Sequence, residues 1–122
     1  MGKTLSVNRP LFIELHDNNR QYLSTGESIE NYPKNLSEYK SNPNEYPIKI
    51  IDELASGTRF TIIDLTHEEK FAAGSFYYIS VKILSGKHKG KVFTHVSPSD
   101  LISNSHTSSP KNWKLKPSIQ EH

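Results

Sequence analysis

Apolar and polar residues alternate most regularly between residues 76 and 84. One face of this segment carries Tyr77, Ile79, Val81 and Ile83, and the other carries Tyr78, Ser80, Lys82 and Leu84. A period of two residues with one apolar face is typical of a half-buried antiparallel strand. We therefore predict a strand over residues 76–84, around which the rest of the chain is interpreted.

A hairpin and a short turn are predicted after this strand. Residues 85–90 (SGKHKG) contain Gly86 and Gly90, which can adopt the positive φ of a tight turn. Residues 91–96 predict the returning strand. In it we expect Val92, Thr94 and Val96 to point inward and Lys91, Phe93 and His95 to point outward. Residues 97–100 then predict a 3₁₀ turn, anchored by Leu101 and Ile102.

Three segments upstream are candidates for further strands. Residues 5–15 alternate, but Pro10 has no backbone N–H to donate, so this is predicted to be a bent or edge strand. Residues 58–65 are rich in β-branched and aromatic residues and predict a strand. Its apolar residues lie on both faces, which indicates a bulge or burial on both sides. Residues 48–54 fit either a short strand or one helical turn, and residues 66–75 predict a connecting loop.

Residues 16–47 have a different composition from the predicted strands. Asn, Ser, Pro, Gly and Glu dominate, and the steps from Asn or Tyr into Pro disfavour helix. Apart from a short strand at Tyr22 and Leu23, we predict a long loop, and loops of this length are usually functional or partly disordered. The loop carries Tyr22, Tyr32, Tyr39 and Tyr46. Tyrosine combines apolar area with a polar tip, so these side chains suit either packing onto the domain or contact with a partner.

The C-terminal residues predict little regular structure. Residues 103–110 are a polar linker, and Trp113 and Leu115 belong to a short alternating segment. A closing strand is therefore predicted near residues 112–116. Residues 118–122 are expected to lack a partner. With 122 residues the chain has the length of one domain.

Several of these segments resemble a bacterial SH3 domain. The segments are residues 57–63 (GTRFTII), the strand and turn over residues 78–90, and Val92 to Val96 followed by SPSDLI. The resemblance implies an all-β fold, a small SH3-like barrel over residues 3–102. It makes residues 16–47 an enlarged, ligand-facing first loop and residues 66–75 a second one. It also implies a non-catalytic module of the cell envelope that binds a protein or a peptidoglycan-type partner.

Three departures change what this resemblance implies. Peptide-binding SH3 domains carry an Ala-Leu-Tyr-Asp-Tyr type segment, which is absent here. They also carry a pair of Trp residues, and this chain has Phe76, Tyr77 and Tyr78 near that position. Their Pro-Ser-Asn-Tyr type segment is replaced by residues 97–101, SPSDL, without the Tyr. A polyproline groove needs parallel aromatic walls, so recognition of Pro-rich peptides is not expected.

A shorter resemblance gives an alternative function. Residues 83–92 (ILSGKHKGKV) are similar to a KOW motif, whose basic turn contacts RNA phosphates. The residues that would do so here are Lys87, His88, Lys89 and Lys91. Charge is also distributed unevenly: residues 1–69 hold 7 Lys or Arg and 11 Asp or Glu, whereas residues 70–117 hold 8 Lys and one acid. Such a basic half could favour anionic partners, but the preferred explanation is that lysines solvate the outer faces of the strands.

No residue pattern predicts catalysis, a metal or a cofactor. The chain has no Cys, which excludes disulfides and thiolate chemistry. The histidines lack metal-ligand spacing, and there is no G-x-S-x-G or G-x-x-x-x-G-K-[ST] motif. The acidic pairs Asp52/Glu53 and Glu68/Glu69 are adjacent, so in an extended chain they point apart. We therefore predict that the protein is not an enzyme.

The predicted function is binding through the long loops. The candidate ligand-binding residues are Tyr22, Tyr39, Tyr46, Tyr78, His95 and Asp100. Tyrosines of residues 16–47 would supply apolar anchors, and residues 66–75 would supply charge. No apolar run is long enough to cross a membrane. Because no signal peptide is visible at Met1, we expect either an exported protein whose leader ended near Lys3, which the resemblance favours, or a cytoplasmic one.

Overall fold

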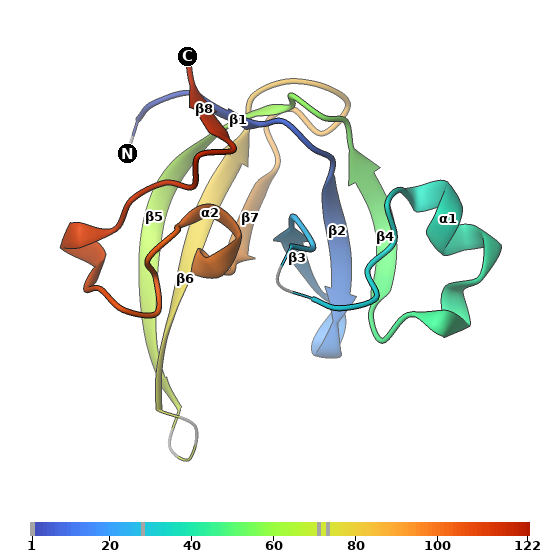
Figure 1. Ribbon diagram of the computed structural model, residues 1–122, viewed down its shortest axis with the longest axis horizontal. Helices are drawn as coiled ribbons and strands as arrows, with labels where there is room; N and C mark the ends of the chain where they lie inside the picture. Colours follow the sequence, from blue (N-terminus) through green and yellow to red (C-terminus); the bar gives the residue numbers. More distant parts are fainter. Residues whose placement is uncertain (1, 28, 71, 73) are drawn as a thin grey trace.

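The computed structural model describes residues 2–27, 29–70, 72 and 74–122. Strands account for 43% of the chain and helices for 16%, so the all-β prediction is confirmed. The described residues form one sheet of eight strands in the order β4-β2-β3-β7-β6-β5-β1-β8. The sheet curls into a half-barrel around the core (Figure 1).

Each element is short except for one long hairpin. The strands are β1 (Leu5–Val7), β2 (Leu11–His16), β3 (Arg20–Ser24), β4 (Lys49–Leu54), β5 (Arg59–Lys70), β6 (Gly74–Ile83), β7 (Val92–Val96) and β8 (Ile119–Glu121). The α-helices are α1 (Leu36–Ser41) and α2 (Pro98–Leu101), and 3₁₀ turns lie at Asp17–Asn19, Pro43–Glu45 and Pro110–Asn112. Residues 48–54, ambiguous in the sequence, are thus the strand β4.

Antiparallel pairing links β8, β1, β5, β6 and β7 in that order. A single parallel pair, Leu23 with Val96, joins β7 to β3, and β2 pairs with both β3 and β4. Pro10 lies in the bend between β1 and β2, as its missing donor predicts. The main core fills the concave side of the sheet. It contains Leu5, Val7, Leu11, Ile13, Leu23, Leu54, Phe60, Ile79, Val81, Ile83, Phe93, Val96, Leu101, Ile102 and Ile119.

The segment predicted as a long loop contains β3, α1 and two 3₁₀ turns. Asn35 begins α1, because its side-chain oxygen accepts a hydrogen bond from the backbone N–H of Glu38. The helix packs beside β4 (Figure 1) and closes a second apolar cluster. This cluster comprises Phe12, Tyr39 and Ile50, with Tyr32, Leu36, Tyr46 and Ile48 packed against it. Burial of these apolar side chains overrides the weak local helix signal.

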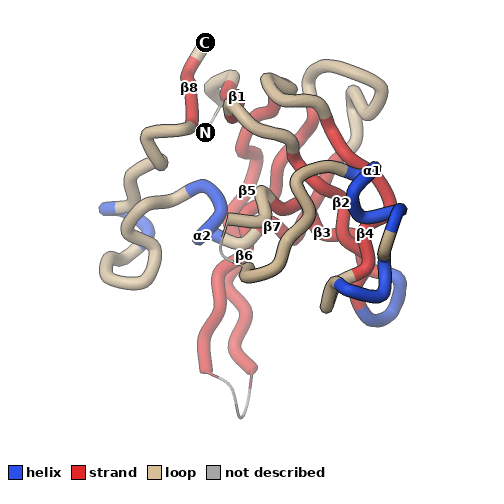
Figure 2. The backbone as a smooth tube through the Cα atoms, turned by 45° about the vertical axis from the view of Figure 1, so that its right-hand side comes forward, coloured by secondary structure: helices blue, strands red, loops and turns tan. Residues whose placement is uncertain are grey.

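The prediction of a connecting loop over residues 66–75 is wrong. Residues 66–70 belong to β5 and residues 74–75 to β6, while Phe71 and Ala73 lie outside the described residues. Thr66 pairs with Tyr78 and His67 with Tyr77, so the hairpin continues beyond the rest of the sheet as an arm (Figure 2). Cross-strand aromatic pairs stabilise such a ribbon although its sequence is polar. The bulge predicted for residues 58–65 is present between Ile62 and Asp64.

The orientation predicted for the strand β7 is wrong at Val92, Phe93 and Thr94. Phe93 is buried at 2% exposure, whereas Val92, at 44%, and Thr94 are exposed, the reverse of the alternation expected. Val81 pairs with Phe93 and Ile79 with Val96. The partners are therefore two positions apart in β6 and three positions apart in β7. This bulge lets Phe93 and Val96 both face the core.

The end of the chain is held more firmly than predicted. Leu115 makes an isolated bridge to Ile102, and no strand covers residues 112–116 within the described part of the chain. The closing strand is instead β8, which pairs with β1 along residues 119–121. Residues 118–122, expected to lack a partner, therefore complete one edge of the sheet. The predicted 3₁₀ turn after β7 is the one-turn helix α2, and Leu101 and Ile102 anchor it in the core as expected.

Candidate functional site: an aromatic cleft

A cleft of about 550 Å³ opens where four separate segments meet. Its lining comes from β2 and β3, from β6, from α2, and from the loop over residues 103–115. We call it the aromatic cleft, because Tyr22, Phe76, Tyr77, Tyr78 and Trp113 line it. Concave sites with aromatic walls and a few polar groups are the usual form of a ligand site.

One wall of the aromatic cleft is a ladder of stacked rings. The Tyr22 ring lies between His16 and His95, with ring centroids 3.9 and 4.9 Å away. The Tyr78 ring lies edge-on to Tyr22, with ring centroids 6.4 Å apart. The Tyr78 ring is also tilted against His95, with centroids 4.9 Å apart. These residues come from β2, β3, β6 and β7, so the ladder joins four strands. It fixes the Tyr22 and Tyr78 rings as a preformed surface.

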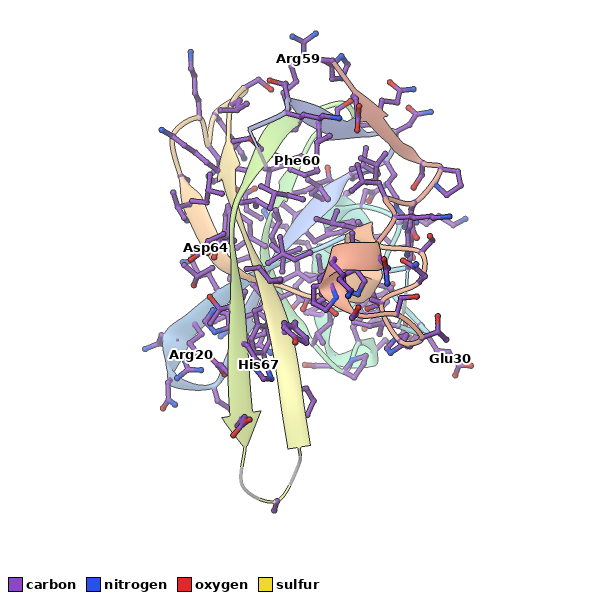
Figure 3. All side chains as sticks on the ribbon, turned by 90° about the vertical axis from the view of Figure 1, so that its left-hand side faces the viewer. Arg20, Glu30, Arg59, Phe60, Asp64 and His67 are labelled. Carbon is purple, nitrogen blue, oxygen red and sulfur yellow. The ribbon has the colours of Figure 1, made fainter. Side chains whose placement is uncertain are left out.

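The opposite wall is built by the arm and the loop over residues 103–115. The Tyr77 ring lies edge-on to Trp113, with ring centroids 5.6 Å apart. The His67 ring stacks on Tyr77, with centroids 4.6 Å apart. Figure 3 shows His67 on the part of β5 that continues toward the tip of the arm. The Trp113 indole N–H donates to the Ser108 carbonyl at 2.9 Å, which holds the ring in place.

The loop behind Trp113 is organised by Asn104. The side-chain oxygen of Asn104 accepts from the Lys114 N–H at 2.9 Å, and its NH₂ group donates to the Asn112 carbonyl at 2.9 Å. Ser103 N–H and the Lys114 carbonyl close the neck of the loop at 2.9 Å. Compact loops with closely spaced ends and internal hydrogen bonds form stable surfaces. The segment predicted to be a polar linker thus forms part of this wall.

Two buried carboxylates lie among the lining residues. Glu14 and Asp100 are each 3% exposed. Oε2 of Glu14 accepts a 2.6 Å hydrogen bond from the Tyr32 hydroxyl, and Oε1 lies 2.8 Å from Nε2 of His16. Burial, and then the hydrogen bond and charge of Glu14, raise the pKa of the Tyr32 hydroxyl well above its usual range. Tyr32 therefore stays a donor to Glu14.

Gly26 makes the contact between Tyr32 and Glu14 possible. Its φ is +76°, and a Cβ there would lie 2.4 Å from the Tyr32 ring. Only glycine combines this conformation with that close approach. The turn after β3 is therefore specified by the packing of Tyr32.

Asp100 lies on α2 and is held by a residue that follows β3. Oδ1 of Asp100 accepts a 2.8 Å hydrogen bond from the Thr25 hydroxyl. Burial raises the pKa of the Asp100 carboxyl to about 6, although the Thr25 hydrogen bond acts to lower it, and the negative charge of Glu14 adds to the rise. The two carboxylates are thus close enough for the charge of Glu14 to act on Asp100.

The structure separates the predicted site residues into two groups. Tyr22, Tyr78 and Asp100 line the aromatic cleft, and His95 supports it by stacking. Tyr39 and Tyr46 instead pack in the second apolar cluster, where Tyr39 is 9% exposed. These two tyrosines thus lie apart from the aromatic cleft, and their expected role as apolar anchors for a ligand stays a prediction.

Sequence reasoning did not select several other residues of the cleft. Among them are Glu14, His16, Phe76, Tyr77 and Trp113. A signal was available for Glu14, because it follows Phe12 at a spacing of two in a strand and so shares its face. Nothing in the sequence brings Trp113 to β6, since their contact depends on the path of the loop over residues 103–115.

The basic turn lies apart from the aromatic cleft and is tied to β4. Nζ of Lys87 lies 2.9 Å from Oδ1 of Asp52, and Nε2 of His88 lies 2.7 Å from Oδ2. Burial raises the pKa of Asp52, but Lys87, the Glu53 N–H and His88 outweigh it and lower the pKa to about 2. Lys91 donates to Gln21 at 2.7 Å. Lys89 is exposed.

Comparisons with protein-family models, curated proteins and solved structures found no match. Among the described residues, no three His, Cys, Asp or Glu side chains gather closely enough to hold a metal ion. Within the same ranges, no helix combines the length and the apolar character needed to span a bilayer.

Proposed function

We propose that this protein is a non-catalytic binding module on an SH3-like barrel, which holds a protein or a cell-envelope glycan in the aromatic cleft. The order of elements supports the SH3-like part of the proposal. The run β8-β1-β5-β6-β7, followed by a one-turn helix, is the meander expected of such a barrel. The segment from β2 to β4 then corresponds to the enlarged first loop, and the arm to the second.

One observation carries the binding role. Tyr22, Tyr77, Tyr78 and Trp113 converge on the aromatic cleft, and all four are only half-buried, although Trp113 also packs against the main core. Ring–ring contacts across four strands keep this surface in one conformation without a ligand. A preformed aromatic surface loses little conformational entropy on binding, which is what a recognition site requires. Both a protein segment and a cell-envelope glycan present groups that can stack on such rings.

The decisive experiment measures retention of defined ligands by the purified protein. Peptidoglycan sacculi and an array of extended peptides are the two probes, and Tyr22→Ala is the test variant. The matched control is Tyr46→Phe, which changes a tyrosine outside the cleft. We expect the wild type and the control to retain at least one probe and Tyr22→Ala to lose it at least tenfold. Retention of neither probe, or equal retention by a folded Tyr22→Ala, contradicts the proposal.

A further inference from the structure

The charge of the aromatic cleft is negative and only partly compensated. Glu14 and Asp100 contribute two carboxylates that are 3% exposed, and none of the described lining residues is a lysine or an arginine. The only described lining side chains that can become cationic are His16 and His106. His16 already contacts Glu14 at 2.8 Å. The side chain that holds Asp100, the Thr25 hydroxyl, is neutral.

The nearest cations outside the lining are occupied by another acid. Glu27 lies 2.9 Å from Arg9 and 2.7 Å from Lys116. Lys116 acts on Asp100 only through its longer-range charge, and burial together with the charge of Glu14 outweighs this effect. A buried carboxylate without an ionic partner is costly, and a cationic donor relieves that cost better than a neutral hydroxyl does.

The aromatic rings suit the same kind of ligand. Cations are attracted to the faces of Trp and Tyr rings, and the methylene stems of lysine and arginine pack along apolar surface while the charged head stays polar. Tyr22, Tyr77 and Trp113 provide such faces beside the two carboxylates. A cleft of about 550 Å³ is larger than one side chain and leaves room for the neighbouring backbone of an extended segment.

We propose that the aromatic cleft binds a lysine or arginine side chain on an extended segment of a partner protein. The stem of this side chain lies against the rings of Tyr22, Tyr77 and Trp113, and the charged head contacts Asp100 and Glu14. Anionic ligands, including nucleic acid, are repelled from this site by the two carboxylates. The inference rests on the proposed function, because it specifies the ligand of the same cleft.

The whole chain does not steer cations toward the cleft, since its formal net charge is +2. Attraction therefore depends on the short-range contacts in the cleft and not on a long-range field. For this reason a peptide with one well-placed lysine should bind, whereas free ammonium or choline should compete only weakly. These small cations separate recognition of a protein segment from recognition of any cation.

The experiment uses Trp113, the single Trp of the chain, as a reporter inside the cleft. Its fluorescence is titrated with a five-residue capped peptide, glycine on both sides of a central lysine, and with analogues that carry norleucine or glutamate at the centre. Norleucine keeps the stem of lysine and removes the charge. We expect the lysine peptide to bind at least tenfold more tightly than either analogue. Choline and a neutral glycan fragment are titrated as further probes.

Asp100→Asn is the test variant, and Glu121→Gln is the matched control, because Glu121 lies outside the lining and its cationic partner is Lys3. We expect Asp100→Asn to bind the lysine peptide at least tenfold more weakly and to leave the norleucine peptide unchanged. Glu14→Gln is a second variant if Asp100→Asn fails to fold, since its amide oxygen can still accept from Tyr32.

The pH dependence provides an independent measurement. Asp100 is faced by Glu14 from β2, by Tyr32 and Thr25 from the segment after β3, and by Lys116 from the C-terminal segment. Protonating Asp100 removes one of the two negative charges, so affinity for the lysine peptide should fall as the pH decreases through about 6. Titration of the lysine peptide at several pH values is therefore done on the wild type and on Asp100→Asn. The loss of affinity that the variant does not show is due to Asp100.

Different outcomes separate the two proposals. Equal binding of the lysine and norleucine peptides, tighter binding of the glutamate peptide, or choline binding as tight as the lysine peptide would overturn the inference. If a glycan binds and the lysine peptide does not, the inference also fails while the proposed function stands. If no probe changes the Trp113 emission and no probe is retained, both fail together.

Discussion

The Thr25 hydroxyl donates a 2.8 Å hydrogen bond to Oδ1 of Asp100, across 75 residues of sequence. Both residues are buried, Thr25 at 1% and Asp100 at 3% exposure. The bond fastens the turn after β3 to the helix α2, and it also fixes one carboxylate of the aromatic cleft. Cleft geometry and domain stability are therefore coupled through this pair.

Asp100 should make the protein more stable as the pH falls toward 4. Burial raises the pKa of this carboxyl from 3.8 to about 6, so between these values the folded state binds more protons than the unfolded state. The stabilising contribution is full below pH 3.8 and is lost as the pH rises through about 6. Its size is on the order of 3 kcal/mol at most.

Urea unfolding at pH 4, 5, 6 and 7 measures this contribution. The difference in free energy of unfolding between the wild type and Asp100→Asn should change in favour of the wild type as the pH decreases. Because every other titrating group is shared, the comparison isolates Asp100. A constant difference across this range would mean that Asp100 titrates as an ordinary exposed carboxyl.

Tyr32→Phe should destabilise the protein, and Tyr46→Phe should not. The Tyr32 hydroxyl donates at 2.6 Å to Glu14, whose carboxylate is buried, so its removal leaves an acceptor unsatisfied. The expected loss is about 1–3 kcal/mol. The Tyr46 hydroxyl donates at 3.1 Å to Glu38 at an exposed position, where water replaces the lost hydrogen bond, so the stability of this variant should stay close to that of the wild type. Equal effects in chemical denaturation would contradict this assignment.

Adjacent residues of β7 should respond very differently to truncation. Phe93 is 2% exposed and Val92 is 44% exposed. Phe93→Ala should cost about 3–5 kcal/mol because it leaves a cavity in the core, and Val92→Ala should cost less than about 1 kcal/mol. The melting temperatures of the two variants report this directly. A larger loss for Val92→Ala would restore the simple alternation predicted for this strand.

Asp52→Asn tests both the anchoring of the basic turn and the RNA alternative. Asp52 holds Lys87 and His88, and its pKa of about 2 means that this stabilisation is present above pH 3.8 and is lost as the pH falls through about 2. The Lys87 side chain is 66% exposed, so solvent screening limits the loss in the variant to about 1 kcal/mol.

If the turn binds RNA, the same substitution should strengthen binding. Releasing Lys87 and His88 from Asp52 frees two side chains for phosphate contacts, so retention of RNA at low salt should increase, and Lys89→Gln should decrease it. Filter binding across a salt series measures both variants. If neither the wild type nor Asp52→Asn retains RNA at low salt, the KOW-like alternative is excluded.

Local pattern was sufficient for much of the central sheet. The burial of Ile79, Val81 and Ile83 and the positive φ of Gly86 and Gly90 (80° and 91°) were predicted correctly, although Ser80 on the other face is buried as well. Such features depend on nearest neighbours in the chain, which the sequence shows directly. The inward face of β7 was not predictable in this way. A bulge is decided by the partner strand, since Phe93 is turned inward only when paired with Val81.

The candidate site was predictable in part for a related reason. Tyr22, Tyr78, His95 and Asp100 were selected by residue type and lie in or beside the aromatic cleft. Tyr39 and Tyr46 have the same residue type but pack in the second apolar cluster, away from the aromatic cleft. Whether a tyrosine of a polar segment faces a ligand or the core depends on which apolar surface is left uncovered, and no local pattern contains that information.

The sequence alone determined the all-β class, the central hairpin and the absence of thiol chemistry, because these follow from residue type and local periodicity. Tertiary structure alone decided where the ends of the chain lie and what the cleft contains. The strand β8 joins β1 although residues 118–122 carry no strong local signal, and Trp113 reaches Tyr77 along a path fixed by the hydrogen bonds of Asn104. Contacts between residues far apart in sequence form only when the core brings them together, so the aromatic cleft is a property of the assembled fold.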